Sequence, residues 1–214
     1  MSASVCAVPQ APTRRPRVAL PGGSCDTHIH VIGPTDAYPL DPRRNYTPVA
    51  CSLALYRSVM AACGIGRAVL VQPSFYGDDN RALLDALREG GAAFRGVVVP
   101  SAGVTDAELE AMHALGVRGL RLNLVNPQIV ALDDVIALCA RVAPLGWHLQ
   151  VQIRWDDAAQ ALLARVAERI TLPLVIDHMG RPTTRKAPPA LLDLLASGRA
   201  WVKLSAPYRT SAQE

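Results

Sequence analysis

The chain has 214 residues, of which 50% are hydrophobic and 19% charged, and it carries a formal net charge of +4 with a pI near 9.0. This composition supplies enough apolar side chains for a sizeable core and predicts a soluble globular protein. No apolar run approaches the roughly 20 residues that cross a membrane, and no export signal opens the chain. The sequence therefore predicts no membrane partner and a cytoplasmic location.

Basic residues are scattered along the sequence, and the densest group is Arg14-Arg15-Pro16-Arg17. With few aromatic residues to stack on bases, this pattern predicts that nucleic acid is not a partner. A basic balance fits a small anionic substrate instead. The cysteines are five, an odd number, and none stands in C-x-x-C spacing. That pattern is typical of reduced thiols and not of a disulfide framework or a zinc knuckle.

Residues 1–23 are rich in proline, which predicts a flexible leader before the folded domain. The next stretch, Cys25–Pro34, reads as a buried strand that contains His28 and His30. Side chains two apart on a strand point to the same side, so the two imidazoles are predicted to share one face. They form either part of a functional site or a pair of core histidines satisfied by hydrogen bonds.

Strands and helices alternate along the rest of the chain. Short apolar runs predict seven strands, at 25–32, 68–71, 96–99, 119–124, 149–153, 174–177 and 201–205. Capping residues and helical spacing predict six helices, at 52–63, 80–89, 105–115, 133–144, 156–169 and 189–196. From the second strand on, the strand ends near positions 72, 100, 124, 152, 178 and 205 lie 24 to 28 residues apart, and no glycine-rich nucleotide fingerprint follows any strand. These features predict an α/β fold of the TIM-type (β/α) barrel class more than a doubly wound sheet.

Polar side chains interrupt these otherwise apolar strands. Arg121, Asn123, Gln150 and Gln152 alternate with apolar residues on two of them. More polar groups stand at strand ends, namely Gln72, Ser74, His178, Lys203 and Ser205. Burying so many polar groups without a ligand or water would cost several kcal/mol. Since barrel enzymes keep their sites at the carboxyl ends of the strands, we expect a functional site there.

The residue types of this set allow two chemistries. His28, His30 and His178 suit either polarisation of a carbonyl oxygen or binding of one divalent metal, zinc or manganese. Asn123 and Gln152 stand where a metal site would offer carboxylates, so the sequence favours the imidazoles acting without a metal. Arg121 and Arg209 suit recognition of a carboxylate.

Several motifs resemble the amidohydrolase superfamily, and within it the branch of the 2-pyrone-4,6-dicarboxylate lactonases and sugar lactonases. They are Asp26–His30, Tyr46–Pro48, Gly119–Asn123, Gly146–His148 and Ile176–Pro182. The resemblance runs from about Cys25 to Arg209. It implies hydrolysis of a cyclic ester by activated water, without a metal in the pyrone branch.

On matching positions, the resemblance implies that His28, His30 and His178 polarise the lactone carbonyl. It gives substrate binding to Tyr46, Ser74, Arg121 and Arg209, and Gln152, which stands where the pyrone enzymes carry a tyrosine, is predicted to bind substrate as well. That difference leaves sugar-acid lactones open as substrates. A metal-dependent amidohydrolase or decarboxylase, with the three histidines as ligands, stays the alternative.

The superfamily's general base is an aspartate at the end of strand eight, and the sequence ends at Glu214, after strand seven. We therefore expect residues 24–214 to form a truncated barrel domain with seven of eight strands. Such a chain is expected either to keep lactonase activity or to be a non-catalytic remnant. Assembly into a homo-oligomer is left open.

Overall fold

The computed structural model describes residues 4–101, 103–125, 132–182 and 188–209. The chain folds into two compact units, which are treated separately below. The first consists of residues 1–100 and 111–117, and the second of residues 101–110 and 118–214. The chain passes between the units after Pro100, within helix α3, Asp106–Leu115, and again at the start of strand β6, Val117–Asn123.

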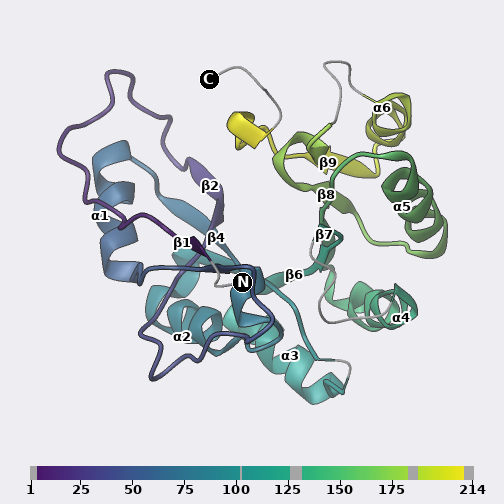
Figure 1. The fold of residues 1–214 in the computed structure, drawn as a ribbon, viewed down its shortest axis with the longest axis horizontal. Coiled ribbons are helices and arrows are strands. Elements are labelled where there is room, and N and C mark those ends of the chain that lie inside the picture. Colours follow the sequence, from purple (N-terminus) through teal and green to yellow (C-terminus); the bar gives the residue numbers. More distant parts are fainter. Residues whose placement is uncertain (1–3, 102, 126–131, 183–187, 210–214) are drawn as a thin grey trace. The chain divides into compact units, whose positions relative to one another are not determined.

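In the described residues of the first unit, the main sheet has three parallel strands, and two helices connect them. Figure 1 shows their ribbon. The strands pair in the order β2 (Cys25–Ile29), β4 (Arg67–Val71) and β5 (Phe94–Val98). The helices are α1 (Leu53–Cys63) and α2 (Arg81–Gly90), and a 3-10 turn, η2 (Gly91–Ala93), follows α2. Helix α2 packs against β4 and β5, as expected of a helix that connects parallel strands.

In the first unit, helix α1 is set by its local sequence, whereas the pairing of its first strand is not. The Ser52 side chain accepts a hydrogen bond from the Leu55 N–H at 3.2 Å, and Gly64 ends α1 with a left-handed φ of 75°. Both ends of this helix were predicted from these residues. Within the predicted leader, β1 (Ser4–Val5) pairs in parallel with β3 (Tyr46–Thr47), a contact that no local pattern indicated.

The second unit continues the same alternation. Its strands pair in parallel in the order β6, β7 (His148–Gln152), β8 (Leu174–Ile176) and β9 (Ala200–Val202). Its helices are α4 (Leu132–Val142), α5 (Asp157–Arg169) and α6 (Pro189–Ala196), with a 3-10 turn, η3 (Ala143–Leu145), after α4. The predicted capping box is present, because the Thr105 N–H donates to Glu108 Oε2 and the Glu108 N–H donates to Thr105 Oγ1.

The central strands β4, β5, β6, β7 and β8 are largely buried, as parallel strands between helices require, whereas β2 is half-buried or exposed along its length. In β7, Leu149, Gln150 and Val151 are all fully buried, although Gln150 is polar. Apart from the short pair β1 and β3, the described residues form seven parallel strands, each but the last followed by a helix, which confirms the predicted incomplete TIM-type (β/α) barrel class with seven of eight strands. Two polar residues of these strands, Arg121 and Gln150, lie in the interior and need partners there.

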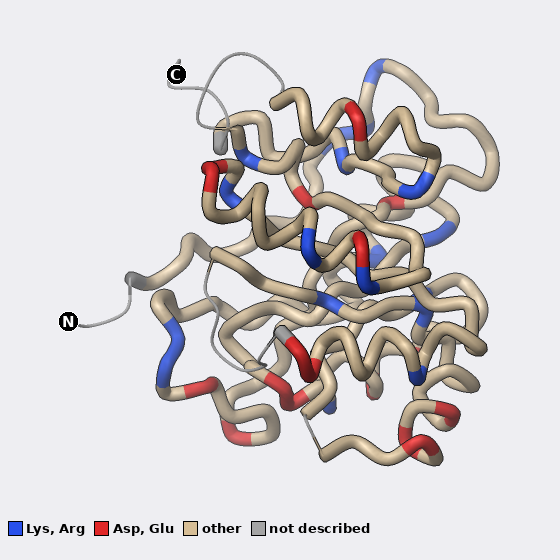
Figure 2. The backbone as a smooth tube through the Cα atoms, turned by 90° about the vertical axis from the view of Figure 1, so that its right-hand side faces the viewer, with Lys and Arg blue, Asp and Glu red and all other residues tan. Residues whose placement is uncertain are grey.

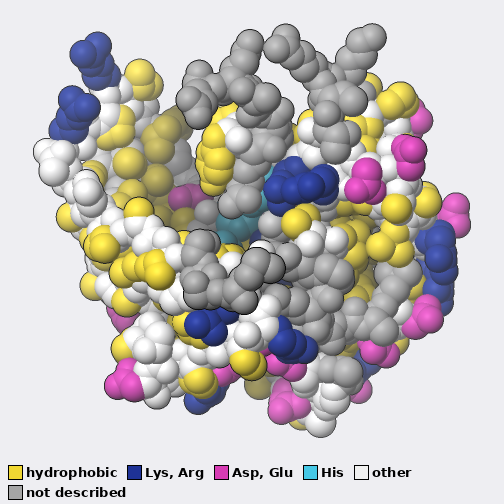
Figure 3. Space-filling view, viewed as in Figure 1, with side chains coloured by type: hydrophobic (Ala, Val, Ile, Leu, Met, Phe, Trp, Pro, Cys, Tyr) yellow, Lys and Arg dark blue, Asp and Glu magenta, His cyan; other side chains and the backbone are white. Residues whose placement is uncertain are grey.

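Charged groups are spread along the chain. Figure 2 shows Lys and Arg distributed among Asp and Glu, and Figure 3 shows hydrophobic side chains interspersed with polar and charged ones on the face drawn. Among the described residues, no helix is both long and apolar enough to cross a membrane. The expected lack of a nucleic-acid partner stays a prediction.

One close approach in the second unit gives a stability prediction. A Cβ atom on Gly119 would lie 2.6 Å from Cε1 of His148, so we expect Gly119→Ala to lower the free energy of unfolding by about 1–3 kcal/mol. Denaturant titration measures the loss. The matched control is Gly66→Ala, where the nearest atom is the Ser24 carbonyl oxygen at 4.0 Å. Equal losses in the two variants would contradict the steric explanation.

Candidate active site

The two imidazoles of the first unit lie together. His28 is in β2, while His30 follows directly after the strand, and a register shift separates Asp26 from Ile29 in the pairing with β4. The ring centroids are 5.1 Å apart with an interplanar angle of 81°. The predicted pairing of the rings is therefore present, although the strand ends at Ile29, before His30.

Asp26 organises the main chain at this point. Its Oδ1 accepts from the His28 backbone N–H at 3.1 Å, and its Oδ2 accepts from the Tyr56 hydroxyl at 3.0 Å. Burial first, and then the Asp26 carboxylate, raise the pKa of Tyr56 well above its ordinary value. Tyr56 therefore stays protonated and ties α1 to the histidine strand. Sequence reasoning did not select Tyr56, because it reads as one more buried position of an amphipathic helix.

His30 has a defined ring proton. Its Nδ1 lies 2.7 Å from the carbonyl oxygen of Val71, at the end of β4. Because a carbonyl oxygen only accepts hydrogen bonds, Nδ1 must carry the proton. In the neutral ring, Nε2 then holds the lone pair and acts as a proton acceptor or a metal ligand, and it becomes a donor only when the ring is an imidazolium.

Tyr46 and Ser74 lie in the same part of the first unit. Tyr46 belongs to β3, and its ring meets that of Phe75 edge to face, with centroids 5.5 Å apart. Ser74 opens the 3-10 turn η1, Ser74–Tyr76, which follows β4. Both residues are half-buried. Part of the chain between residues 33 and 50 is thereby packed against the chain after β4, as a substrate-binding segment would need.

The second unit holds a buried polar cluster of five side chains: Arg121, Gln150, Gln152, Asp177 and Lys203. Arg121 Nη2 donates to Gln152 Oε1 at 2.6 Å. Gln150 Nε2 donates to Asp177 Oδ2 at 3.0 Å, and its Oε1 accepts from Lys203 Nζ at 2.7 Å. The Asp177 carboxylate lies 3.5 Å from Arg121 Nη2 and 3.5 Å from Lys203 Nζ. Two cations thus flank one carboxylate.

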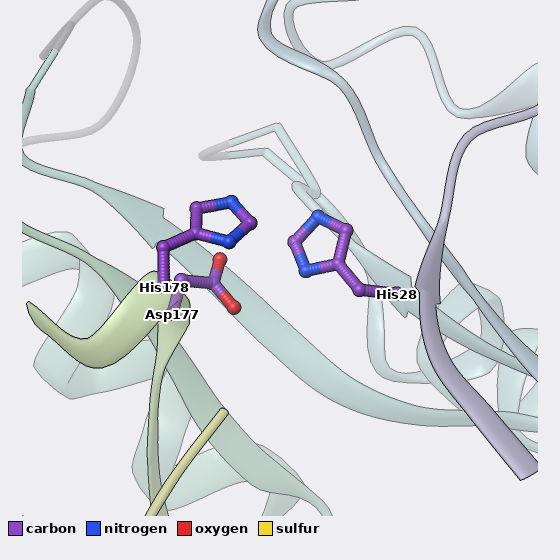
Figure 4. Close-up of side chains that lie close together, drawn as sticks. All are labelled: His28, Asp177 and His178. Atoms are coloured by element: carbon purple, nitrogen blue, oxygen red, sulfur yellow. The ribbon is translucent and has the colours of Figure 1, made fainter. Parts of the chain in front are cut away.

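The cluster combines two cations with one anion. The exposed fractions of the side chains are 4% for Arg121, 0% for Asp177 and 10% for Lys203. Two positive charges and one negative charge are thus brought together on side chains that are mostly removed from water. Sequence reasoning did not select Asp177. Its signal was its place at the end of a buried strand, directly before His178, and Figure 4 shows the two side chains next to each other.

His178 and Arg209 are the remaining predicted residues. His178 lies in the 3-10 segment η4, Asp177–Gly180, and its Nδ1 is 2.9 Å from Oγ of Ser205. Arg209 ends the turn η5, Pro207–Arg209, but its side chain lies outside the described part of the structure. The second unit therefore joins Arg121 with Gln152, and His178 with Ser205, while the role of Arg209 stays a prediction.

His148 gives a pH prediction. Burial first, and then Lys203, lower its pKa from 6.5 to about 4, against the raising effect of a hydrogen bond to the Arg118 carbonyl. Because the folded state binds the proton more weakly, stability is complete above about pH 6.5 and falls toward pH 4, by at most about 1.4 kcal/mol per pH unit. We expect His148→Gln to flatten this dependence in thermal unfolding curves. Parallel pH profiles of the two proteins would contradict the assignment.

Known proteins are similar to this chain over nearly its whole length. A protein-family model described as Amidohydrolase matches residues 25–214. The 2-pyrone-4,6-dicarboxylate hydrolase of Comamonas testosteroni is 34% identical over 205 residues, which cover 92% of this chain and 67% of that protein. The 4-sulfomuconolactone hydrolase of Hydrogenophaga intermedia is 35% identical over 213 residues, with 96% and 70% covered.

A solved structure from Pseudomonas putida, assigned as a 2-pyrone-4,6-dicarboxylic acid hydrolase, is also similar. It has a TM-score of 0.74 and 35% sequence identity, and the match covers 91% of this chain and 72% of that one. The similarity thus extends over nearly the whole chain, in both sequence and fold.

Proposed function

The chain belongs to the amidohydrolase family, and from this premise we propose that it hydrolyses a lactone of a carboxylated small molecule, such as 2-pyrone-4,6-dicarboxylate. Two of its relatives are named as hydrolases of 2-pyrone-4,6-dicarboxylate and of 4-sulfomuconolactone. Both names denote cyclic esters that carry acidic groups. A small anionic substrate is also what the basic balance of the sequence suggested.

The observation that carries this proposal is the pair of cations, Arg121 and Lys203, that flanks the Asp177 carboxylate in the buried polar cluster. A substrate carboxylate beside these two cations would form charge-assisted hydrogen bonds. Arg121 is suited to this contact because a guanidinium binds a carboxylate through two parallel hydrogen bonds. Its Nη2 is held by Gln152 at 2.6 Å, so Gln152 supports the substrate contact by orienting the arginine.

The proposed reaction adds water to the lactone carbonyl. The oxygen of water bonds to the carbonyl carbon, the ring C–O bond breaks, and the ring oxygen takes up a proton. His28, His30 and His178 would stabilise the negative charge that develops on the carbonyl oxygen, and neutral His30 would first need a second proton to donate from Nε2. Tyr46, Ser74 and Arg209 are proposed to contact the rest of the substrate.

A second candidate, a metal-dependent amidohydrolase, is favoured by one contact. Histidines that bind metals usually donate their second ring N–H to a carbonyl or carboxylate, and His30 does this to Val71. His30 therefore fits a divalent ion such as zinc or manganese, with His28 and His178 as the other predicted ligands. Asp177 fits one less well, because Arg121 and Lys203 already surround its carboxylate. When bound, such an ion would polarise the carbonyl and acidify water.

The lactonase proposal is tested by assaying the full chain on a set of lactones. We expect ring opening of 2-pyrone-4,6-dicarboxylate, followed by the loss of pyrone absorbance, and slower opening of neutral aldonolactones. The control is His178→Asn, in which turnover should drop to the spontaneous rate. No opening of any lactone by a folded protein would reject the proposal.

Metal removal separates the two candidates. For the lactonase proposal, we expect activity to survive dialysis against a chelator. For the metal-dependent enzyme, elemental analysis should find about one zinc or manganese ion per chain, and the chelator should abolish activity until the ion is restored.

A further inference from the structure

The Ser205 side chain contacts His178, one of the predicted catalytic residues. Its Oγ lies 2.9 Å from Nδ1 of His178, and both residues are half-buried. Strand β9 ends at Val202, so Ser205 stands on the irregular chain that follows the strand. Its position therefore depends on contacts other than the ladder of the sheet.

The backbone that carries His178 is unusual. The φ angles of His178, Met179, Gly180 and Arg181 are 52°, 55°, 71° and 47°, so four consecutive residues are left-handed. Residues with a side chain rarely adopt this conformation. A run of this kind persists where the surrounding contacts determine it, and such runs occur at functional sites.

One carbonyl group links this turn to Ser205. The carbonyl oxygen of Lys203 accepts from the Met179 N–H at 3.0 Å and from the Ser205 N–H at 3.0 Å. The Lys203 N–H in turn donates to the carbonyl oxygen of Ile176 at 2.9 Å. The same segment therefore holds the left-handed turn and the hydroxyl, which fixes the place of that hydroxyl relative to the imidazole.

The Nδ1 atoms of two histidines have chemically different partners. His30 faces the Val71 carbonyl, which can only accept. His178 faces the Ser205 hydroxyl, which can donate as well as accept. A neutral imidazole that donates from Nε2 to a substrate carbonyl has its lone pair on Nδ1, and only a donor can hold that atom. Ser205 meets this need, whereas a carbonyl does not.

We infer that Ser205 is a positioning residue that donates its hydroxyl proton to Nδ1 of His178 and so keeps the ring proton on Nε2. This inference rests on the proposed function, in which Nε2–H of His178 donates to the lactone carbonyl oxygen. His30 has the opposite tautomer when neutral. The two histidines are thus prepared for different parts in the reaction.

The tautomer is measured by long-range ¹H–¹⁵N NMR of the full chain near neutral pH, with the His178 signals identified from His178→Gln. We expect the pattern of an imidazole protonated on Nε2 in the unmodified protein, and a mixture of tautomers in Ser205→Ala. A His178 ring protonated on Nδ1 in the unmodified protein would overturn the inference. That spectrum needs no variant at Ser205, so it decides the point even if Ser205→Ala does not fold.

Kinetics give a second readout. We expect Ser205→Ala to lower kcat by about 10–100-fold with KM little changed, and Ser205→Thr, which keeps the hydroxyl, to restore most of the rate. Ser197→Ala is the matched control, because that hydroxyl donates to the Leu194 carbonyl at the end of α6. An unchanged kcat in Ser205→Ala would overturn the inference. If no lactone is opened, the proposed function fails, but the NMR spectrum still shows which ring nitrogen of His178 carries the proton. Failure of the proposed function and failure of the Ser205 inference are therefore distinguishable.

Discussion

Asp177→Asn is expected to lower the free energy of unfolding by about 3–5 kcal/mol, since it removes the one anion of a buried cluster. The substitution keeps the shape of the side chain but changes the net charge of the cluster from +1 to +2. Arg121 and Lys203 would then face each other across a neutral amide, each having lost a carboxylate at 3.5 Å. Denaturant unfolding at neutral pH measures the loss.

The control for this prediction is Asp133→Asn in the same unit. Asp133 Oδ1 pairs with Arg169 Nη1 at 2.8 Å, but the two side chains are 81% and 48% exposed. Exposed pairs contribute little, so we expect a loss of no more than about 1 kcal/mol. If the two variants were equally stable, Asp177 would not be the compensating charge of the cluster.

Arg121→Met is expected to raise KM for 2-pyrone-4,6-dicarboxylate by about 100-fold or more, because it removes two charge-assisted hydrogen bonds to a carboxylate. For a neutral lactone, KM should change little. The cluster would become neutral, with Lys203 left to face Asp177, so we expect the fold to tolerate this change better than Asp177→Asn. Steady-state kinetics on both substrates measures the difference.

Two further variants sharpen the Arg121 prediction. Arg121→Lys keeps the charge but cannot form the planar pair of hydrogen bonds, so KM should take an intermediate value. Arg169→Met removes a guanidinium from the exposed side of α5 and should leave KM unchanged for both lactones. Equal changes for neutral and anionic lactones in Arg121→Met would mean that Arg121 acts on the structure alone.

Most of the βα repeat could be predicted from the sequence because its causes are local. The apolar runs, the Ser52 cap and the Thr105–Glu108 capping box each act within a few residues. Two features escaped prediction. The pairing of β1 with β3 joins residues about 40 positions apart, and the left-handed turn at His178 is set by contacts with the chain at Lys203.

The sequence by itself determined which chemical groups this protein has for its reaction: the histidines His28, His30 and His178, and polar residues that alternate with apolar ones on buried strands. It did so because strand periodicity places side chains without knowledge of their neighbours. Only the tertiary structure decided what each group can do. A partner from a distant segment determines which ring nitrogen of a histidine is protonated and which charges lie next to an ionised side chain. Val71 gives His30 its tautomer, and Asp177 stands between Arg121 and Lys203.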